Sequence, residues 1–96
     1  MSYLFHERVT AEATVKDVND LAVPNNATSA RLQADTSDIR YTCDGATNPS
    51  QTTGMVLVNG LEPEDFLLED ILKIRFTRGS GTNGGLNIHY YAGRDV

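Results

Sequence analysis

The sequence predicts an all-β domain, an antiparallel β-sandwich of jelly-roll-like form with one short helical turn near residues 63–70. Three observations lead to this prediction. Apolar and polar residues alternate with a period of two in several short segments, Gly- and Asn-rich connections separate them, and only one short segment has helical features. A chain of 96 residues is long enough for one domain with one thin core.

The first half of the chain contains three alternating segments. Residues 9–15 show the clearest strand pattern, so we divide the chain into an N-terminal arm, residues 1–8, and a single sandwich domain, residues 9–96. Residues 30–35 and 39–44 alternate in the same way. Thr36-Ser37 lies between them and is expected to turn one strand back on the next.

The second half continues the pattern after a polar surface loop, residues 44–53. Residues 55–58 are apolar on both sides, which predicts a strand covered on both faces or one whose second face meets a partner. Pro63 and the acids after it favour a helix start, hence the helical turn. Residues 72–76 and 86–91 are expected to form a hairpin through the glycine-rich loop 79–85.

One inward-facing apolar set is expected to form the core. Its members are Val9, Ala11, Ala13, Val15, Leu32, Ile39, Tyr41, Leu57, Ile74, Phe76 and Ile88.

Charge and composition exclude several functional classes. Thirteen acidic against eight basic residues give a net charge of -5, which opposes binding to nucleic acid or to anionic membranes. The N-terminal residues lack the pattern of a signal peptide, and no segment is apolar enough to span a membrane, so we expect synthesis and retention in a reducing cytoplasm. The single cysteine, Cys43, is expected to be a small buried residue, and the two distant histidines do not complete a zinc site with it.

Catalytic and cofactor motifs all have a simpler explanation. Residues 79–84 match G-x-G-x-x-G, but a strand follows them where a dinucleotide site needs a helix N-terminus. The acids of residues 62–70 read as an exposed turn, since catalytic carboxylates need unlike environments. Asp35, Asp38 and Asp44 lack the spacing of a calcium loop, and turn-forming roles suffice for them. We therefore expect no enzyme activity, no catalytic residue, no cofactor and no metal.

Two groups of residues remain as interface candidates. Tyr3, Leu4 and Phe5 are large apolar residues in an otherwise polar terminus, where a free monomer gains nothing from displaying them. Asn87, His89 and Tyr91 occupy the outward face of the last strand, and exposed aromatic residues beside polar groups suit a contact patch. We expect a homo-oligomer.

A longer pattern covers residues 23–91. It contains Pro24, Ala27-Thr28, Ala34, Arg40-Tyr41, Asp44-Gly45 and Gly54-Met55, with closing strands at residues 72–76 and 86–91. This pattern resembles small virion proteins of tailed bacteriophages, in which "P-x-x-A-T … A … R-Y-x-x-D-G-x-x-P-T … G-M-x-L" recurs.

The resemblance implies a structural protein of the phage particle, with capsid decoration or cement of the head first and a tail or neck component second. It implies the virion as the location after synthesis in the host bacterial cytoplasm, the major capsid protein or other virion proteins as partners, and a trimer as the oligomer. The competing class is a stand-alone carbohydrate- or ligand-binding sandwich. Sites of that class often have rows of exposed Trp, and this chain has none.

Overall fold

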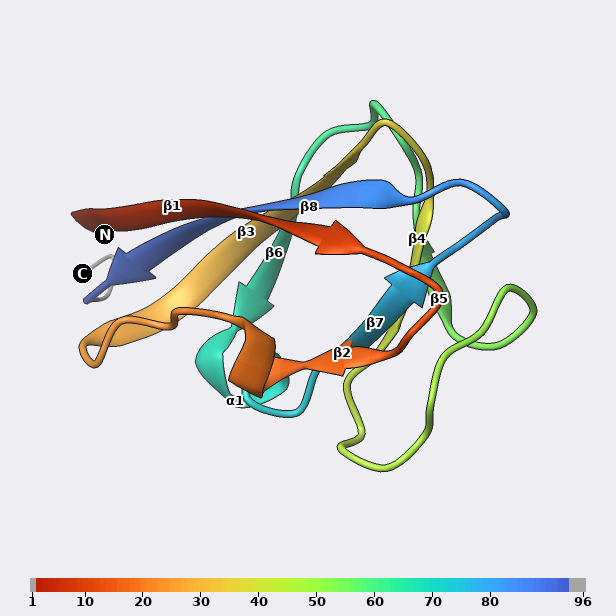
Figure 1. Ribbon diagram of the computed structural model, residues 1–96. Helices are drawn as coiled ribbons and strands as arrows, with labels where there is room; N and C mark the ends of the chain where they lie inside the picture. Colours follow the sequence, from red (N-terminus) through yellow and green to blue (C-terminus); the bar gives the residue numbers. More distant parts are fainter. Residues whose placement is uncertain (1, 94–96) are drawn as a thin grey trace.

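Two four-stranded antiparallel sheets make up the fold in the computed structural model, which describes residues 2–93 (Figure 1). In spatial order, the first sheet consists of β1 (Ser2–Ala11), β8 (Gly84–Ala92), β3 (Ala27–Asp35) and β6 (Glu64–Leu67). The second sheet consists of β2 (Lys16–Asp17), β7 (Arg75–Arg78), β4 (Ile39–Thr42) and β5 (Met55–Leu57). A 3-10 turn, η1 (Val18–Asp20), and one α-helical turn, α1 (Leu68–Ile71), lie between strands.

The order of the strands is that of a jelly roll. The first strand pairs with the last, and the other pairs follow inward along the chain as β2 with β7, β3 with β6 and β4 with β5. Two further pairs, β8 with β3 and β7 with β4, complete the sheets. This arrangement gives the two Greek keys of a jelly roll, so the predicted fold class is confirmed.

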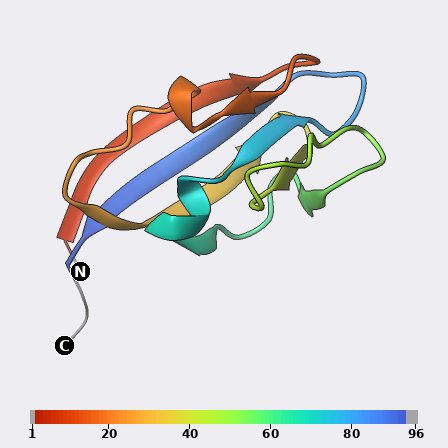
Figure 2. The same cartoon turned by 90° about the horizontal axis from the view of Figure 1, so that it is seen from below.

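The two sheets differ in length. In the first sheet β1, β8 and β3 have 10, 9 and 9 residues, whereas the strands of the second sheet have between 2 and 4. Figure 2 shows β1 and β8 running side by side along the molecule, whose longest extent is 41 Å. Ser2 pairs with Ala92, so the first and last strands meet at one end. One end of the first sheet therefore extends past the second.

Residues 2–8 belong to this long sheet and do not form a separate arm. They are the first part of β1, paired with β8 along their whole length apart from a bulge at Leu4. The sequence placed the start of the domain at residue 9, where the clearest alternation begins. Glu7 nevertheless faces inward, where its carboxylate accepts a hydrogen bond of 2.7 Å from the hydroxyl of Tyr90 and one of 2.8 Å from the backbone N–H of Ala22.

The core fills the space between the sheets. Its buried members are Ala11, Ala27, Ala30, Leu32, Ala34, Ile39, Tyr41, Leu57, Ile71, Ile74, Phe76, Leu86, Ile88 and Tyr90. Most of the predicted core is among them. Val9 and Val15 are only half-buried, and Ala13 is exposed. Because β1 ends at Ala11, the alternation that continues through residues 12–15 has no sheet to lie in.

Neither expected hairpin forms, because the strands involved lie in different sheets. The Thr36-Ser37 turn carries the chain from β3 in one sheet to β4 in the other, and the glycine-rich loop carries it from β7 back to β8. The two crossovers pack against each other: the N–H of Gly79 donates to the carbonyl of Asp38 at 2.8 Å. A Cβ at Gly84 would lie 2.7 Å from the Ser37 carbonyl oxygen. Glycines of the G-x-G-x-x-G pattern thus permit close backbone packing.

The segment predicted as a helical turn is divided between two elements. Residues 64–67 form β6, which pairs with β3, and the helical turn α1 follows at residues 68–71 with Ile71 buried. The inward alternation of Glu64 and Phe66 overrides the helix-start signal. The short strand β5 is an edge strand, and of its residues only Leu57 is buried.

Candidate binding face

The outer face of the first sheet, which turns away from the core, collects the predicted residues of the last strand. Along β8, Leu86, Ile88 and Tyr90 point into the core. Asn87, His89 and Tyr91 alternate with them, so they point outward. Because β8 lies between β1 and β3, these three side chains run along the middle of the sheet with neighbours on both sides.

Aromatic rings gather at one end of this outer face. The ring of Tyr3, from β1, lies edge-on to His89 with centroids 5.2 Å apart and to Tyr91 with centroids 6.1 Å apart. The imidazole of His6 lies edge-on to that of His89 at 4.8 Å. These T-shaped contacts hold the four rings in one cluster. The structure thus brings Tyr3 together with the predicted residues of β8.

Leu4 and Phe5, which the sequence grouped with Tyr3, lie elsewhere. The bulge between Tyr3 and Phe5 turns the strand so that Phe5 is opposite Tyr90 and stacks on its ring at 6.2 Å. Phe5 is therefore on the core side at the end of the sheet, where 41% of it remains exposed. Leu4 is half-buried against the core. The outer face takes only Tyr3 from this group.

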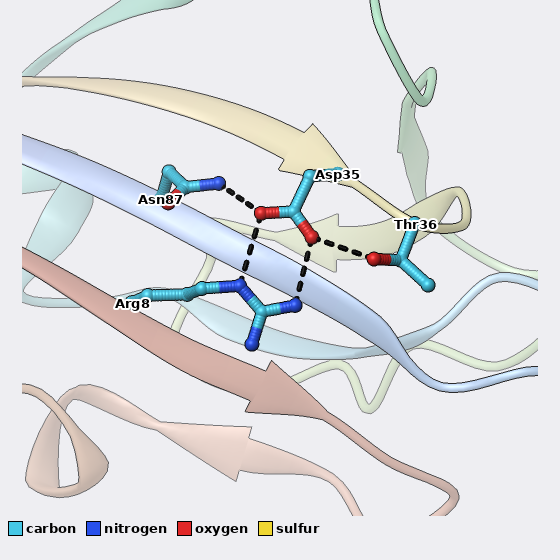
Figure 3. A network of polar contacts seen from close by, with 4 residues as sticks. All are labelled: Arg8, Asp35, Thr36 and Asn87. Atoms are coloured by element: carbon cyan, nitrogen blue, oxygen red, sulfur yellow. Dashed lines mark hydrogen bonds and ion pairs between the residues drawn. The ribbon is translucent and has the colours of Figure 1, made fainter.

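A polar network spans three strands at the other end of the face (Figure 3). The guanidinium of Arg8, from β1, reaches across β8 to the carboxylate of Asp35 on β3, with N–O distances of 2.8 and 3.0 Å. The side-chain amide of Asn87 and the hydroxyl of Thr36 also donate to this carboxylate. The hydrogen bond from Arg8, with those from Asn87 and Thr36, holds the pKa of Asp35 well below its usual value.

A glycine makes this network possible. The ion pair passes over Gly85 of β8, where a Cβ would lie 2.2 Å from Nη2 of Arg8 and 2.4 Å from Oδ1 of Asp35. A side chain at position 85 would collide with the ion pair, so a glycine at this position leaves room for it.

Two more polar side chains of β3 complete the face. Nε of Arg31 donates to the carboxylate of Asp65, on β6, at 2.8 Å. The side-chain amide of Gln33 donates to the carbonyl of Leu61 at 2.8 Å. The roles of Arg8, Arg31, Gln33 and Asp35 in this face were not predicted from the sequence. The signal for Arg31, Gln33 and Asp35 was the alternation of residues 30–35, which predicts an outward polar row without showing which strand lies beside it. Arg8 had no such signal, because residues 1–8 were expected to form an arm.

These side chains surround an open groove of about 430 Å³. Its lining consists of His6, Arg31, Gln33, Pro63, Asn87, His89 and Tyr91. Asp35 and Asp65 lie outside it, each held by an arginine. The groove thus offers rings, amides and a guanidinium, which can bind a small polar ligand.

Residues with catalytic or metal-binding potential do not converge. Burial raises the pKa of the Cys43 thiol to about 11, and the thiol is only partly accessible. Asp38 accepts from the backbone of Asn59, and Asp44 from the backbone of Ala46 and Thr47. No group of three or more His, Cys, Asp or Glu side chains within residues 2–93 is placed to hold a metal ion. In the same range, no helix has the length and apolar character needed to cross a membrane.

Comparison with protein-family models, with curated proteins and with solved structures found no match for this chain. The chain is therefore classified by its fold, as a small jelly-roll protein with an open polar face.

Proposed function

We propose that this chain is a non-enzymatic structural protein of a tailed-bacteriophage particle, a decoration or cement protein that stabilises the head. Two independent features support the proposal. The sequence pattern of residues 23–91 resembles small virion proteins, and the jelly roll is an architecture that viral capsid proteins use repeatedly. The observation that carries the proposal is a third one, the apolar surface at the open edge of the sandwich.

That surface lies where the edge strands of the two sheets, β5 and β6, approach each other. A groove of about 460 Å³ runs between them, and its apolar lining includes Val56, Val58 and Leu61. Val58 is 44% exposed and Leu61 is 59% exposed. Exposed apolar side chains that gather in one groove are typical of an interaction site.

The chemistry of the groove suggests its partner. Glu62 and Glu64 also line it, and no basic side chain among the described residues does so. Within the part of the chain that the structure describes, each edge strand beside the groove has a hydrogen-bonded neighbour on one side only. An extended segment of a capsid protein with apolar and basic side chains would add a strand there and complement the acids.

The strand β1 is the proposed contact between copies in a trimer. It pairs with β8 alone, so its other edge is free of a strand partner within residues 2–93. Lys16 covers that edge near one end, where its ammonium donates to the carbonyl of Thr10 at 2.7 Å. Near the other end of β1, the rings of Tyr3 and Phe5 are substantially exposed.

Attachment can be tested by adding purified protein to particles whose gene for this chain has been deleted. Wild type should co-sediment with the particles, and a variant with Val58→Ser and Leu61→Ser should lose most of this binding. Leu72→Ser is the matched control, because Leu72 is 52% exposed and lies outside the groove. Equal binding of all three proteins, or none by the wild type, would contradict attachment through this edge.

The oligomer is tested separately by light scattering. A trimer has three times the monomer mass of 10.5 kDa. Tyr3→Ser with Phe5→Ser should shift it toward monomer. Point substitutions are needed, because deleting residues 1–8 would remove most of β1 and the Glu7 contact with Tyr90.

A further inference from the structure

The charge of the outer-face groove differs from that of the whole chain. The protein has 13 acidic and 8 basic residues, yet within residues 2–93 the groove lining contains Arg31, His6 and His89 and no carboxylate. From this basic lining, together with the amide and aromatic side chains of the groove, we propose that it binds an acidic saccharide, a pyranose sugar that carries a carboxylate. The inference stands independently of the proposed attachment to a particle, since it uses a different groove that shares only Gln33 with the first.

Arg31 supplies the recognition of the carboxylate. Only its Nε is engaged, with Asp65, and the two terminal nitrogens have no partner among the described residues. Asp65 has a side chain 71% exposed, and exposed ion pairs of this kind contribute little to stability. The planar fork of an arginine matches a carboxylate with two parallel hydrogen bonds. A sugar carboxylate can therefore bind the free end of Arg31 without disrupting the fold.

Two amide side chains supply acceptors for hydroxyl groups. The NH₂ of Asn87 donates one hydrogen bond to Asp35, and the NH₂ of Gln33 donates one to the carbonyl of Leu61. These contacts fix the orientation of each amide and leave its oxygen as the acceptor. Side chains that are ordered before binding lose less entropy when the ligand arrives.

The ring cluster supplies the surface on which a pyranose can lie. Tyr91 lines the groove and is held edge-on by Tyr3, while His89 is held between Tyr3 and His6. Aromatic side chains combine an apolar face with a polar tip, which suits a ligand with C–H groups on one side and hydroxyls around its rim. The groove thus has a group for each part of an acidic sugar: the guanidinium for its carboxylate, the amide oxygens for its hydroxyls, and the aromatic rings for its pyranose face.

Other ligands fit less well. A polynucleotide would bring many phosphates toward a chain with a net charge of -5. An acidic peptide could also pair with Arg31, but it has no pyranose ring to lie on the aromatic cluster, and a glutamate oligomer serves as the competing ligand in the calorimetry.

The first experiment presents the labelled full-length protein to an array of glycans. The array should include oligosaccharides with glucuronic, galacturonic, sialic and 3-deoxyoctulosonic acids beside neutral glycans. Binding to one or more acidic glycans is expected. Absence of binding to every acidic glycan, or equal binding to neutral ones, overturns the proposal.

Calorimetry on the best-bound glycan then tests the mechanism. Reducing its carboxylate to an alcohol should weaken binding by about tenfold, and Arg31→Gln should weaken binding of the intact glycan by a similar factor. Lys73→Gln removes the same charge from an exposed residue outside the groove and should leave affinity unchanged. An equal loss of affinity in Arg31→Gln and Lys73→Gln would refute recognition of a sugar by Arg31. An affinity of the wild type for hexaglutamate equal to its affinity for the glycan would refute it as well.

Nuclear magnetic resonance of the wild type gives a readout that needs no variant. On titration with the same glycan, amide shifts should concentrate at His6, Arg31, Asn87, His89 and Tyr91. Shifts concentrated at Val56, Val58 and Leu61 would place the ligand in the other groove and overturn the assignment.

Discussion

Replacing Leu32 by Ala tests the core directly, because Leu32 lies in β3 between two neighbouring strands and is completely buried. Loss of its methyl and methylene groups alone costs roughly 2 kcal/mol, and the cavity raises the cost to about 3–5 kcal/mol. A domain of 96 residues is expected to have a total stability of about 5–14 kcal/mol. The substitution should therefore remove a large share of it.

Urea unfolding at one fixed protein concentration measures this effect, since association would otherwise change the midpoint. Leu67→Ala is the matched control: Leu67 lies on β6 with 59% of its surface exposed, and the same change there should cost less than about 1 kcal/mol. Similar midpoints for Leu32→Ala and wild type would refute the assignment of β3 to the middle of the sheet.

Three further predictions follow from local contacts. Because the hydrogen bond from Arg8 lowers the pKa of Asp35, the pair stabilises the fold above the unfolded carboxyl pKa near 4, and this contribution disappears as the pH falls further. The urea midpoint of Asp35→Asn should therefore lie below that of wild type at pH 7 and approach it near pH 2. Since burial raises the pKa of Cys43 to about 11, its thiolate fraction at pH 8 falls roughly a hundredfold, and the greater nucleophilicity of a more basic thiolate offsets part of this; a thiol reagent should therefore modify it roughly tenfold more slowly in the folded protein than in urea. Gly84→Ala should lower the melting temperature, because its Cβ would meet backbone at 2.7 Å, whereas Gly81→Ala, with nothing within 4 Å, should not; equal effects would contradict the packing of the crossovers.

The sequence predicted the class of fold because period-two alternation depends only on which residues face the core. In β3 and β8 the pattern identified both the buried row and the outward row. Alternation does not reveal which strand lies beside which. The turn at Thr36-Ser37 therefore looked like a hairpin, although β3 and β4 lie in different sheets. Pairing in a jelly roll joins the two ends of the chain, and no local signal carries that information.

The candidate face shows the same limit. The outward positions of Asn87, His89 and Tyr91 followed from alternation within one strand. The contribution of His6 and Arg8 was not predicted, because the first strand was expected to begin at residue 9. The role of Glu7 as acceptor for Tyr90 depends on the pairing of β1 with β8, which the sequence does not reveal. A polar residue inside a strand can satisfy a buried hydroxyl, and only the tertiary partner distinguishes this from a break in the strand.

The central proposal is that this chain is a building block of a virion, and its copy number in purified particles tests that proposal most directly. Quantitative mass spectrometry against the major capsid protein should find the chain in hundreds of copies per particle, in a fixed ratio to the shell. About five to twelve copies would indicate instead a component of the neck or tail, where rings of that symmetry occur. Particles that lack the chain entirely, from cells that express it, would contradict the proposal.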